Sequence, residues 1–337
     1  GAGATSKSFA WINANDPDDP TYVALRLASI SEYGALDNRI SRAIRLKWGG
    51  TLASDEAPDQ LEARAKALTD LGHNAQIVGA NVIAELEPGL RQRPAIAFYC
   101  ENEGAVDPVA AARTFAEVAA EHGAAVIEGC AVLGLEMAGD SVTGVSTTTG
   151  PIFSDAVVLA SGIHTARLAE AVGVNVPMSN RFGALMHTRP LLSVINRVVL
   201  LDGLHMHQRP DGTVIAGPDF TGALAETSSD GSPIESDNGK SVRPTAVAQS
   251  LRDALERSVA LTEPVKVARA TYGERPVPAD GRPIVGRVHE RPGLYLAVMH
   301  SGVTLAPIIG ALAASELSSG SDAQLLSPYR ISRFASP

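Results

Sequence analysis

The chain has 337 residues, of which 45% are hydrophobic and 19% are charged, and its net charge is −9. This length suffices for about two domains with ordinary buried cores. The negative charge and the lack of a basic run argue against nucleic acid as a partner. The sequence contains no run of about 18 apolar residues, so we expect no integral membrane segment.

Two further features bear on compartment and core. Aromatic residues make up only 4% of the chain, so the core must consist of Ala, Val, Leu and Ile, as is typical of α/β proteins. Cys100 and Cys130 have no metal-ligand spacing and are predicted to be buried thiols. With no recognisable signal peptide, these thiols favour a cytoplasmic location.

The first six residues, Gly1-Ala2-Gly3-Ala4-Thr5-Ser6, have the glycine spacing of a dinucleotide-binding turn. No strand precedes them, and residues 7–16 lack the pattern of a packed helix, so the context of that motif is absent. We therefore predict a loop here rather than a GxGxxG fingerprint.

The clearest unit runs from residue 104 to residue 162. Asp107 and Pro108 predict the start of a helix over 109–122, which ends at Gly123. Strands are predicted over 124–127, 131–135, 140–146 and 155–160, the last of them buried on both faces. Ser161-Gly162 and a helix over 165–172 follow, so strand, glycine turn and helix form a notch where α/β proteins bind cofactors.

The second half alternates short strands and turns. Residues 204–209 and 213–217 flank a Pro-Asp-Gly turn and predict a hairpin. Residues 226–240 predict an exposed loop, and residues 245–259 predict an amphipathic helix. The last unit is a strand over 293–298, a turn of small residues at 300–302, and a helix over 304–317.

His205 and His207 are two residues apart on a predicted strand, so they share one face. With His187 they could suggest a metal site, but no carboxylate or cysteine completes a ligand set, and we expect no metal. Two interpretations stay open. Either this strand lies under the substrate and one histidine contacts it, or the histidines occupy an exposed strand face.

At the C-terminal unit the motifs resemble those of the D-amino-acid oxidase, glycine oxidase and sarcosine oxidase (DAO) family of FAD-dependent oxidoreductases. Two upstream stretches and the tail around Pro328-Tyr329-Arg330 agree with the same family. The resemblance rests on Tyr272-Gly273-Glu274-Arg275-Pro276, Asp280–Gly286, Gly293–Ala297 and His300–Pro307, with Gly104–Pro108 and Asp155–Gly162 upstream.

The resemblance implies an α/β fold in which an incomplete, Rossmann-like FAD-binding domain is interleaved with an antiparallel-sheet substrate domain. The cofactor domain would comprise residues 1–50, 103–180 and 270–337, and the substrate domain residues 51–102 and 181–269. The family opens with a strand, a GxGxxG turn and a helix that this sequence lacks. We therefore expect either a truncated start or a segment supplied by the full-length protein or by another chain, and a homo-oligomer is left open.

The implied reaction is oxidation of the C–N bond of a D-amino acid, glycine, sarcosine or a similar small amine, by hydride transfer to flavin N5. Arg275 would hold the substrate carboxylate by two parallel hydrogen bonds. Its alternative role is a salt bridge with Glu274 or Asp280. His300, beside the flavin turn, would tune the ring or the substrate amine, or would be an ordinary turn residue.

Most of the residues expected to contact FAD lie in turns, where their backbone groups would face the cofactor. Ser301, Gly302, Val303 and Thr304 would stabilise negative charge on the reduced ring, or would form a simple turn with Thr304 as helix cap. Trp48 would lie near the ring edge or in the core. No cysteine stands before the final turn, so the flavin is expected to be non-covalent. The remaining cofactor positions are Ala4, Thr5, Ser6, Gly49, Gly50, Val132, Ala160, Ser161, Gly162 and Gly273.

Two other functions compete with this one. The same arrangement could oxidise a 2-hydroxy acid, or the chain could be a flavin-free fragment or an assembly component that only binds a partner. Substrate-dependent bleaching of the flavin, and the colour of the purified protein, would separate these alternatives.

Overall fold

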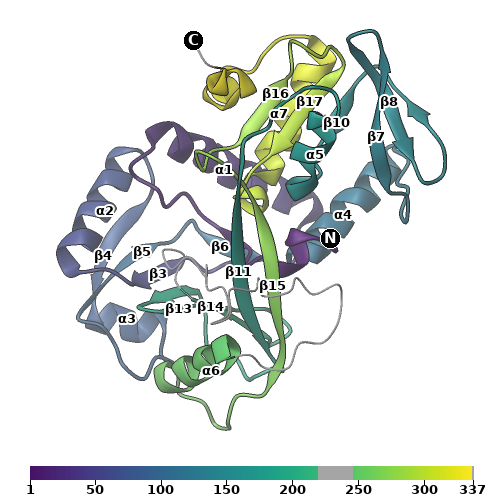
Figure 1. Ribbon diagram of the computed structural model, residues 1–337. Coiled ribbons are helices and arrows are strands. Elements are labelled where there is room, and N and C mark those ends of the chain that lie inside the picture. The colour runs from purple at the N-terminus through teal and green to yellow at the C-terminus, as the bar shows by residue number, and fades with distance from the viewer. Residues whose placement is uncertain (219–245, 336–337) are drawn as a thin grey trace. The chain divides into compact units, whose positions relative to one another are not determined.

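The computed structural model describes residues 1–218 and 246–335, which form two compact units (Figure 1). Unit 1 comprises Gly1–Thr114 and Phe182–Gly273, and unit 2 comprises Phe115–Arg181 and Glu274–Pro337. Each unit is described by itself. The loop predicted over 226–240 lies outside the described residues.

An eight-stranded sheet is the main feature of the first unit. β12 and β3 pair in parallel, and the other registered pairs in this sheet are antiparallel. The predicted hairpin is confirmed, because His207 of β13 pairs with Ile215 of β14. In spatial order the strands are β15 (Val267–Pro278), β11 (Met178–Thr188), β14 (Val214–Gly217), β13 (Leu204–Gln208), β12 (Val198–Leu201), β3 (Thr51–Ser54), β5 (Ile96–Cys100) and β4 (Ala75–Gly79).

Both faces of this sheet are buried, because its apolar side chains alternate between two core clusters. Leu52 belongs to the cluster that contains Ile83 of α3 (Ala80–Leu86) and residues of α6 (Ala246–Ser258). Its neighbour Ala53 belongs to the cluster that contains residues of α2 (Pro58–Asp70) and Phe9. α6 confirms the helix predicted over 245–259.

A three-stranded sheet and two capped helices complete the first part of the chain. The sheet order is β1 (Trp11–Ile12), β6 (Gly104–Val106) and β2 (Leu46–Trp48). α1 (Pro20–Ile44) starts where the Asp19 carboxylate accepts a hydrogen bond from the Tyr22 amide at 3.1 Å. α4 (Pro108–Glu121) starts as predicted, because Asp107 accepts hydrogen bonds from the Val109 and Ala110 amides, both at 3.1 Å.

Unit 2 contains two small sheets with helices around them. One sheet has the order β10, β17, β16, and the other has the order β7, β8, β9. The first shares an apolar core with α5 and the chain end. The bounds are β7 (Val132–Ala138), β8 (Ser141–Thr147), β9 (Ile152–Phe153), β10 (Val157–Leu159), η2 (Gly162–His164), α5 (Thr165–Glu170), β16 (Ile284–Arg287), β17 (Leu294–Val298), α7 (Gly302–Ser319), η3 (Gln324–Tyr329) and η4 (Ile331–Phe334).

Three local predictions are wrong. Residues 124–127 form no strand, because no strand among the described residues pairs with them, and Val126 and Ile127 are more than half exposed. β10 is buried on one face only, since Val158 is 40% exposed between buried neighbours. Cys130 is not buried, because it precedes β7 in a loop, where its thiol lies 3.2 Å from the Thr149 hydroxyl.

α7 qualifies the expectation about membrane segments. Among the described residues it is one helix with the length and composition to cross a bilayer, with a mean hydropathy of 1.3 over 18 residues. Core helices of soluble proteins satisfy the same criterion. Its one charged side chain, Glu316, is fully buried and accepts hydrogen bonds from Arg330, from the Tyr295 hydroxyl at 2.8 Å and from the Ala323 amide at 2.6 Å. This network ties α7 to β17 and to the chain end.

Candidate functional site

The cofactor turns predicted in unit 2 meet at one sheet edge. β10 and β17 pair in parallel, with Leu159 opposite Leu296, so the carboxyl ends of both strands reach the same edge. Ala160, Ser161 and Gly162 follow the first strand, and residues 299–301 follow the second. The structure thereby brings together two segments that are more than 130 residues apart in sequence, as the strand–turn–helix interpretation requires.

A side chain at the glycine of either turn would make only ordinary van der Waals contacts. Gly162 has φ +57°, and a side chain there would meet nothing closer than Pro276 at 3.9 Å. At Gly302 the nearest atom would be Met299 Cγ at 3.8 Å. The α7 helix begins at Gly302 with Ser301 as its N-cap residue, so Thr304 is not the cap. The first turn of α7 therefore presents amide groups and a positive helix end at this edge.

Arg275 lies on β15, directly before the proline that faces Gly162. Its side chain is partly buried, and burial, followed by the charge of Arg181, lowers the pKa of its guanidinium. Asp280, one proposed salt-bridge partner, instead pairs with Arg333, with Nε and Oδ2 2.7 Å apart. The residue that follows Arg275 thus contacts a predicted flavin turn, and the role of Arg275 as a substrate clamp stays a prediction.

The remaining unit 2 candidates occupy more exposed positions. His300 is exposed in the turn before α7, and Val132 opens β7 with 37% of its surface exposed. Ser161 Oγ lies 3.1 Å from Thr165 Oγ1, so the two hydroxyls form a hydrogen bond with each other across η2. Their cofactor roles stay predictions.

In unit 1, the predicted cofactor positions Ala4, Thr5 and Ser6 lie in a short 3₁₀ helix, η1 (Ala4–Lys7), where the sequence predicted a loop. Ser6 Oγ donates to the carbonyls of Ala2 and Gly3 at 3.1 and 3.0 Å. A side chain at Gly273 would lie 2.9 Å from Lys7 Cβ, so β15 packs directly against η1. Packing against this helix is therefore sufficient to explain the glycine at position 273.

Gly49 and Gly50 also lie close to backbone carbonyl groups of neighbouring segments. A side chain at Gly49 would lie 2.6 Å from the Asn196 carbonyl, and one at Gly50 would lie 2.8 Å from the Cys100 carbonyl. Trp48 is 37% exposed, so it is not a core residue, and its ring meets that of Tyr33 edge-on at 6.3 Å. The glycines allow strands to approach closely.

His205 and His207 share a face of the sheet, as predicted, but that face is not exposed. His205, His207 and His187 are each at most 3% exposed. His207 Nε2 lies 2.8 Å from the Phe9 carbonyl oxygen, and His205 Nε2 lies 3.5 Å from Asp55 Oδ2. Each is engaged by a protein group, so the interpretation as an exposed strand face is wrong for both.

His187 makes the stability of the folded protein depend on pH. Burial, then the charges of Arg269 and Arg209, lower its pKa to about 3 from 6.5. The unfolded chain therefore binds more protons below pH 6.5, and stability is lost as the pH falls from 6.5 toward 3. We expect His187→Gln to flatten this decline by up to about 1.4 kcal/mol per pH unit.

Urea unfolding between pH 6.5 and 4 measures the effect, with the exposed His289→Gln as the matched control. An unchanged slope in His187→Gln would show that this imidazole is not held neutral in the folded protein.

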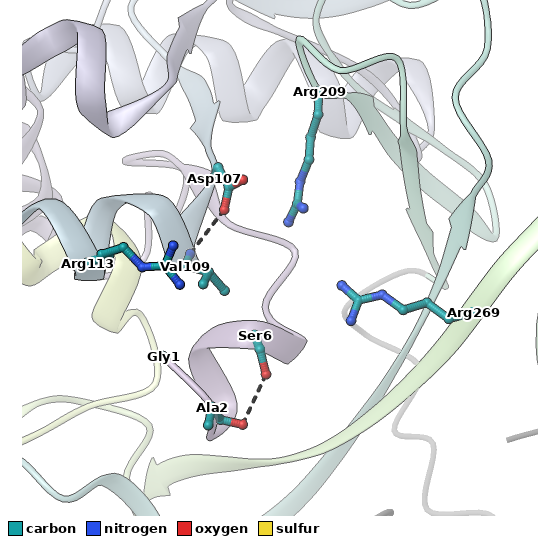
Figure 2. A pocket seen from close by; sticks show the side chains of 8 residues that line it. All are labelled: Gly1, Ala2, Ser6, Asp107, Val109, Arg113, Arg209 and Arg269. Atoms are coloured by element: carbon teal, nitrogen blue, oxygen red, sulfur yellow. Dashed lines mark hydrogen bonds between the residues drawn. The ribbon is translucent and has the colours of Figure 1, made fainter. Parts of the chain in front are cut away.

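A cavity of about 530 Å³ lies within unit 1 (Figure 2). It is bounded by η1, by the first turn of α4 and by two strands of the large sheet. Its lining residues are Gly1, Ala2, Ser6, Asp107, Val109, Arg113, Arg209 and Arg269. Sequence reasoning missed both Arg209 and Arg269, although Arg209 stands at the predicted hairpin turn and Arg269 precedes Arg275 on the same strand.

A second polar cluster has metal-ligand residue types. His73, Cys100 and Glu103 are buried with their ligand atoms within 4.8 Å of one another. Glu103 accepts hydrogen bonds from Trp11 Nε1 at 3.1 Å and from the Ala14 amide at 3.0 Å, and it lies 3.0 Å from His73 Nε2. These contacts make it a hydrogen-bond network that ties β1 to the loop after β5.

The geometry agrees with the comparison to known proteins. The family model of FAD-dependent oxidoreductases named DAO matches residues 1–316. The chain belongs to this family. FAD is accordingly the cofactor of this DAO-family protein.

Individual relatives cover most of the chain. Glycine oxidase of Geobacillus kaustophilus is 27% identical over 288 residues, which are 83% of this chain and 71% of that protein. One component of the opine oxidase of Rhizobium meliloti is 25% identical, over 97% of this chain and 86% of that protein. The glycine oxidase structure from Geobacillus kaustophilus has a TM-score of 0.83 at 22% identity, covering 100% of this chain and 90% of that one.

The unit 2 edge fits a flavin. Two glycine turns, at Gly162 and Gly302, flank the end of a parallel strand pair, and neither glycine is closely packed. The amides that begin α7 suit a group that gains negative charge. In this DAO-family chain, these turns would hold FAD, which supplies a hydride acceptor.

Proposed function

We propose that this DAO-family protein oxidises the C–N bond of a small amino acid or secondary amine, with the hydride accepted by FAD. The observation that carries the proposal is that Pro276, the residue after Arg275 on β15, contacts the Gly162 turn, at the edge where α7 begins. A cation next to a flavin-binding turn suits a substrate that bears a carboxylate.

The residues of the chain have separate tasks in this proposal. The Arg275 guanidinium binds the substrate carboxylate through two parallel N–H···O bonds and so orients the α-carbon. The first amides of α7 stabilise the negative charge that develops at the flavin ring. Partial burial of Arg275 strengthens its pairing with an anion, because water competes less there.

The names of the relatives support an amine substrate. A glycine oxidase and an opine oxidase are among the curated relatives. Structural neighbours include an L-amino acid deaminase of Proteus vulgaris and an L-proline dehydrogenase. All four names describe amino acids or amines with a carboxylate. This shared chemistry agrees with a carboxylate clamp at Arg275.

The test is reduction of the bound flavin without oxygen. Protein loaded with FAD is mixed with glycine, sarcosine, D- and L-alanine or proline, and loss of the visible flavin absorption is followed. We expect at least one amine to bleach the flavin and to yield a keto or aldehyde product. Bleaching by lactate or glycolate alone would replace the proposal by 2-hydroxy-acid oxidation, and protein that stays colourless with FAD would contradict any oxidase function.

A further inference from the structure

The turn of residues 8–10, between η1 and β1, has a strained backbone. Ala10 has φ +63°, in the left-handed region that a residue with a Cβ atom rarely adopts, and it is only 3% exposed. A conformation of this kind persists only where the surrounding contacts enforce it, and such residues cluster at functional sites. The contacts that enforce it here therefore indicate what the turn is for.

Hydrogen bonds from three directions hold this turn. The Ala10 amide donates to Ser8 Oγ at 3.0 Å, and the Val106 amide of β6 donates to the Ala10 carbonyl at 3.2 Å. From the large sheet, His207 of β13 places Nε2 2.8 Å from the Phe9 carbonyl oxygen. The His207 ring also meets the Phe9 ring edge-on, with the centroids 4.9 Å apart. His207 thus connects the turn to the centre of the eight-stranded sheet.

His207 is a hydrogen-bond donor in this contact. Burial lowers the pKa of His207 to about 4, although the hydrogen bond to Phe9 opposes the shift, and the charges of Arg209 and Lys47 add to it. The ring is therefore neutral at pH 7 and carries one proton. Because a carbonyl oxygen only accepts hydrogen bonds, that proton lies on Nε2. Removal of the imidazole would leave the buried Phe9 carbonyl without this donor.

The turn also determines where η1 lies. The Ser8 amide donates to the Thr5 carbonyl at 3.2 Å, so η1 leads directly into the turn. Within unit 1, η1 also packs against β15, where Lys7 lies against Gly273. If Ala10 relaxed to a negative φ, the chain before it would leave in a different direction, and η1 would lose this position.

We propose that His207 is a positioning residue for cofactor binding: by donating to the Phe9 carbonyl, it keeps the strained turn in place and holds η1 where its residues can contact FAD. The proposal rests on the predicted FAD contacts of η1, which are Ala4, Thr5 and Ser6. It gives His207 a role through the backbone of this helix, instead of a contact with substrate. FAD binding is measured without substrate, so the proposed amine oxidation can fail and leave this proposal unaffected.

The first arm of the test follows hydrogen–deuterium exchange in the FAD-loaded protein. In His207→Leu, which removes the donor, the amides of residues 4–10 should exchange about tenfold faster, because the turn opens more often. In His207→Gln a side-chain amide can replace the Nε2 donor, so exchange should stay within about threefold of the parent rate. Parent-like exchange in His207→Leu overturns the proposal, because His207 then does not hold the turn.

The second arm measures how tightly each variant holds FAD. Dilution of the loaded protein releases flavin, and the flavin fluorescence at each concentration gives the Kd. We expect the Kd to rise about tenfold in His207→Leu and to stay within about threefold in His207→Gln. Faster exchange with an unchanged Kd in His207→Leu overturns the proposal, because the position of η1 then does not affect FAD. Equal losses in both variants also overturn it, since they would show that the imidazole fills space instead of donating.

Met206→Ala is the matched control. Met206 precedes His207 on β13 and is fully buried, but it belongs to the core cluster that does not contain Phe9. The cavity left by this substitution should lower the melting temperature. It should change neither the exchange of residues 4–10 nor the Kd of FAD by more than about threefold. If Met206→Ala weakens FAD binding as much as His207→Leu does, the effect is one of general stability, and the proposal is overturned.

Ser8→Ala tests the same turn without a change in the large sheet. It removes the oxygen that accepts the hydrogen bond of the Ala10 amide, so the Kd of FAD should rise at least about threefold. This variant is decisive if His207→Leu does not fold. A smaller rise in Ser8→Ala would then overturn the proposal.

Discussion

Arg275→Ala is expected to lower kcat/KM for the amine substrate at least about 150-fold, which corresponds to roughly 3 kcal/mol of lost transition-state binding. The loss should appear mainly in KM, because the clamp binds the carboxylate in the ground state as well as during hydride transfer. Arg275→Lys keeps a charge but loses the planar fork, so its effect should fall between the parent protein and the alanine variant.

Steady-state kinetics at several substrate concentrations measures this effect, and the exposed Arg167→Ala in the same unit is the control. The flavin spectrum of each variant shows whether cofactor binding is intact. If Arg275→Ala retains FAD and its kcat/KM is within threefold of the parent value, Arg275 does not bind the carboxylate.

Arg330→Met is expected to lower the free energy of unfolding by about 3–5 kcal/mol at neutral pH. The substitution leaves the carboxylate of Glu316 fully buried without its cation, although the Tyr295 hydroxyl and the Ala323 amide still donate to it. Breaking one side of a buried pair costs more than removing both sides. The double variant Arg330→Met/Glu316→Gln should therefore recover part of the loss.

At acidic pH, the free energies of unfolding of the parent protein and of Arg330→Met should differ less than at neutral pH. Burial opposes ionisation of Glu316, but hydrogen bonds from Arg330, Ala323 and Tyr295 hold its pKa below the usual value of 4.5. The pair contributes its stability above pH 4.5 and loses it as the pH falls through the folded-state pKa. Urea unfolding at pH 7 and pH 4 gives both values, and a variant within 1 kcal/mol of the parent at pH 7 would show that the pair contributes little.

Local elements could be predicted wherever the chain carries its own signal. Asp107-Pro108 specifies a helix start through one carboxylate and a fixed φ, and Pro-Asp-Gly specifies a hairpin turn. α4, α6, α7 and the β13–β14 hairpin accordingly agree with the sequence. Residues 124–127 have a strand-like composition, yet a strand also needs a partner, and no local pattern supplies one.

Long-range pairing was not predictable from one sequence. The parallel contact between β12 and β3 joins residues that are far apart in the chain, and no turn chemistry specifies that register. The burial of side chains was not predictable either. The alternation of residues places His205 and His207 on one face of the strand, but it does not show what covers that face.

The candidate site was predictable in its motifs and not in its electrostatics. The turns at Gly162 and Gly302 follow from strand, glycine and helix order, and the structure places both at one edge. The Arg209 and Arg269 pair depends on a hairpin end and a distant strand meeting in one cavity. Neither arginine belongs to a recognisable sequence motif, so their proximity could be seen only in the structure.

The parallel pair of β10 and β17 has a consequence during protein synthesis. β10, which contains Leu159, cannot pair with β17 until Leu296 has been synthesised. At ribosomal speeds this takes about ten seconds or more. Throughout that interval the nascent chain carries an apolar strand whose edge is unsatisfied, which is a target for chaperones and proteases. A stop codon upstream of Leu294 would make this state permanent, so the cell would remove such a product rather than keep it as a shortened enzyme.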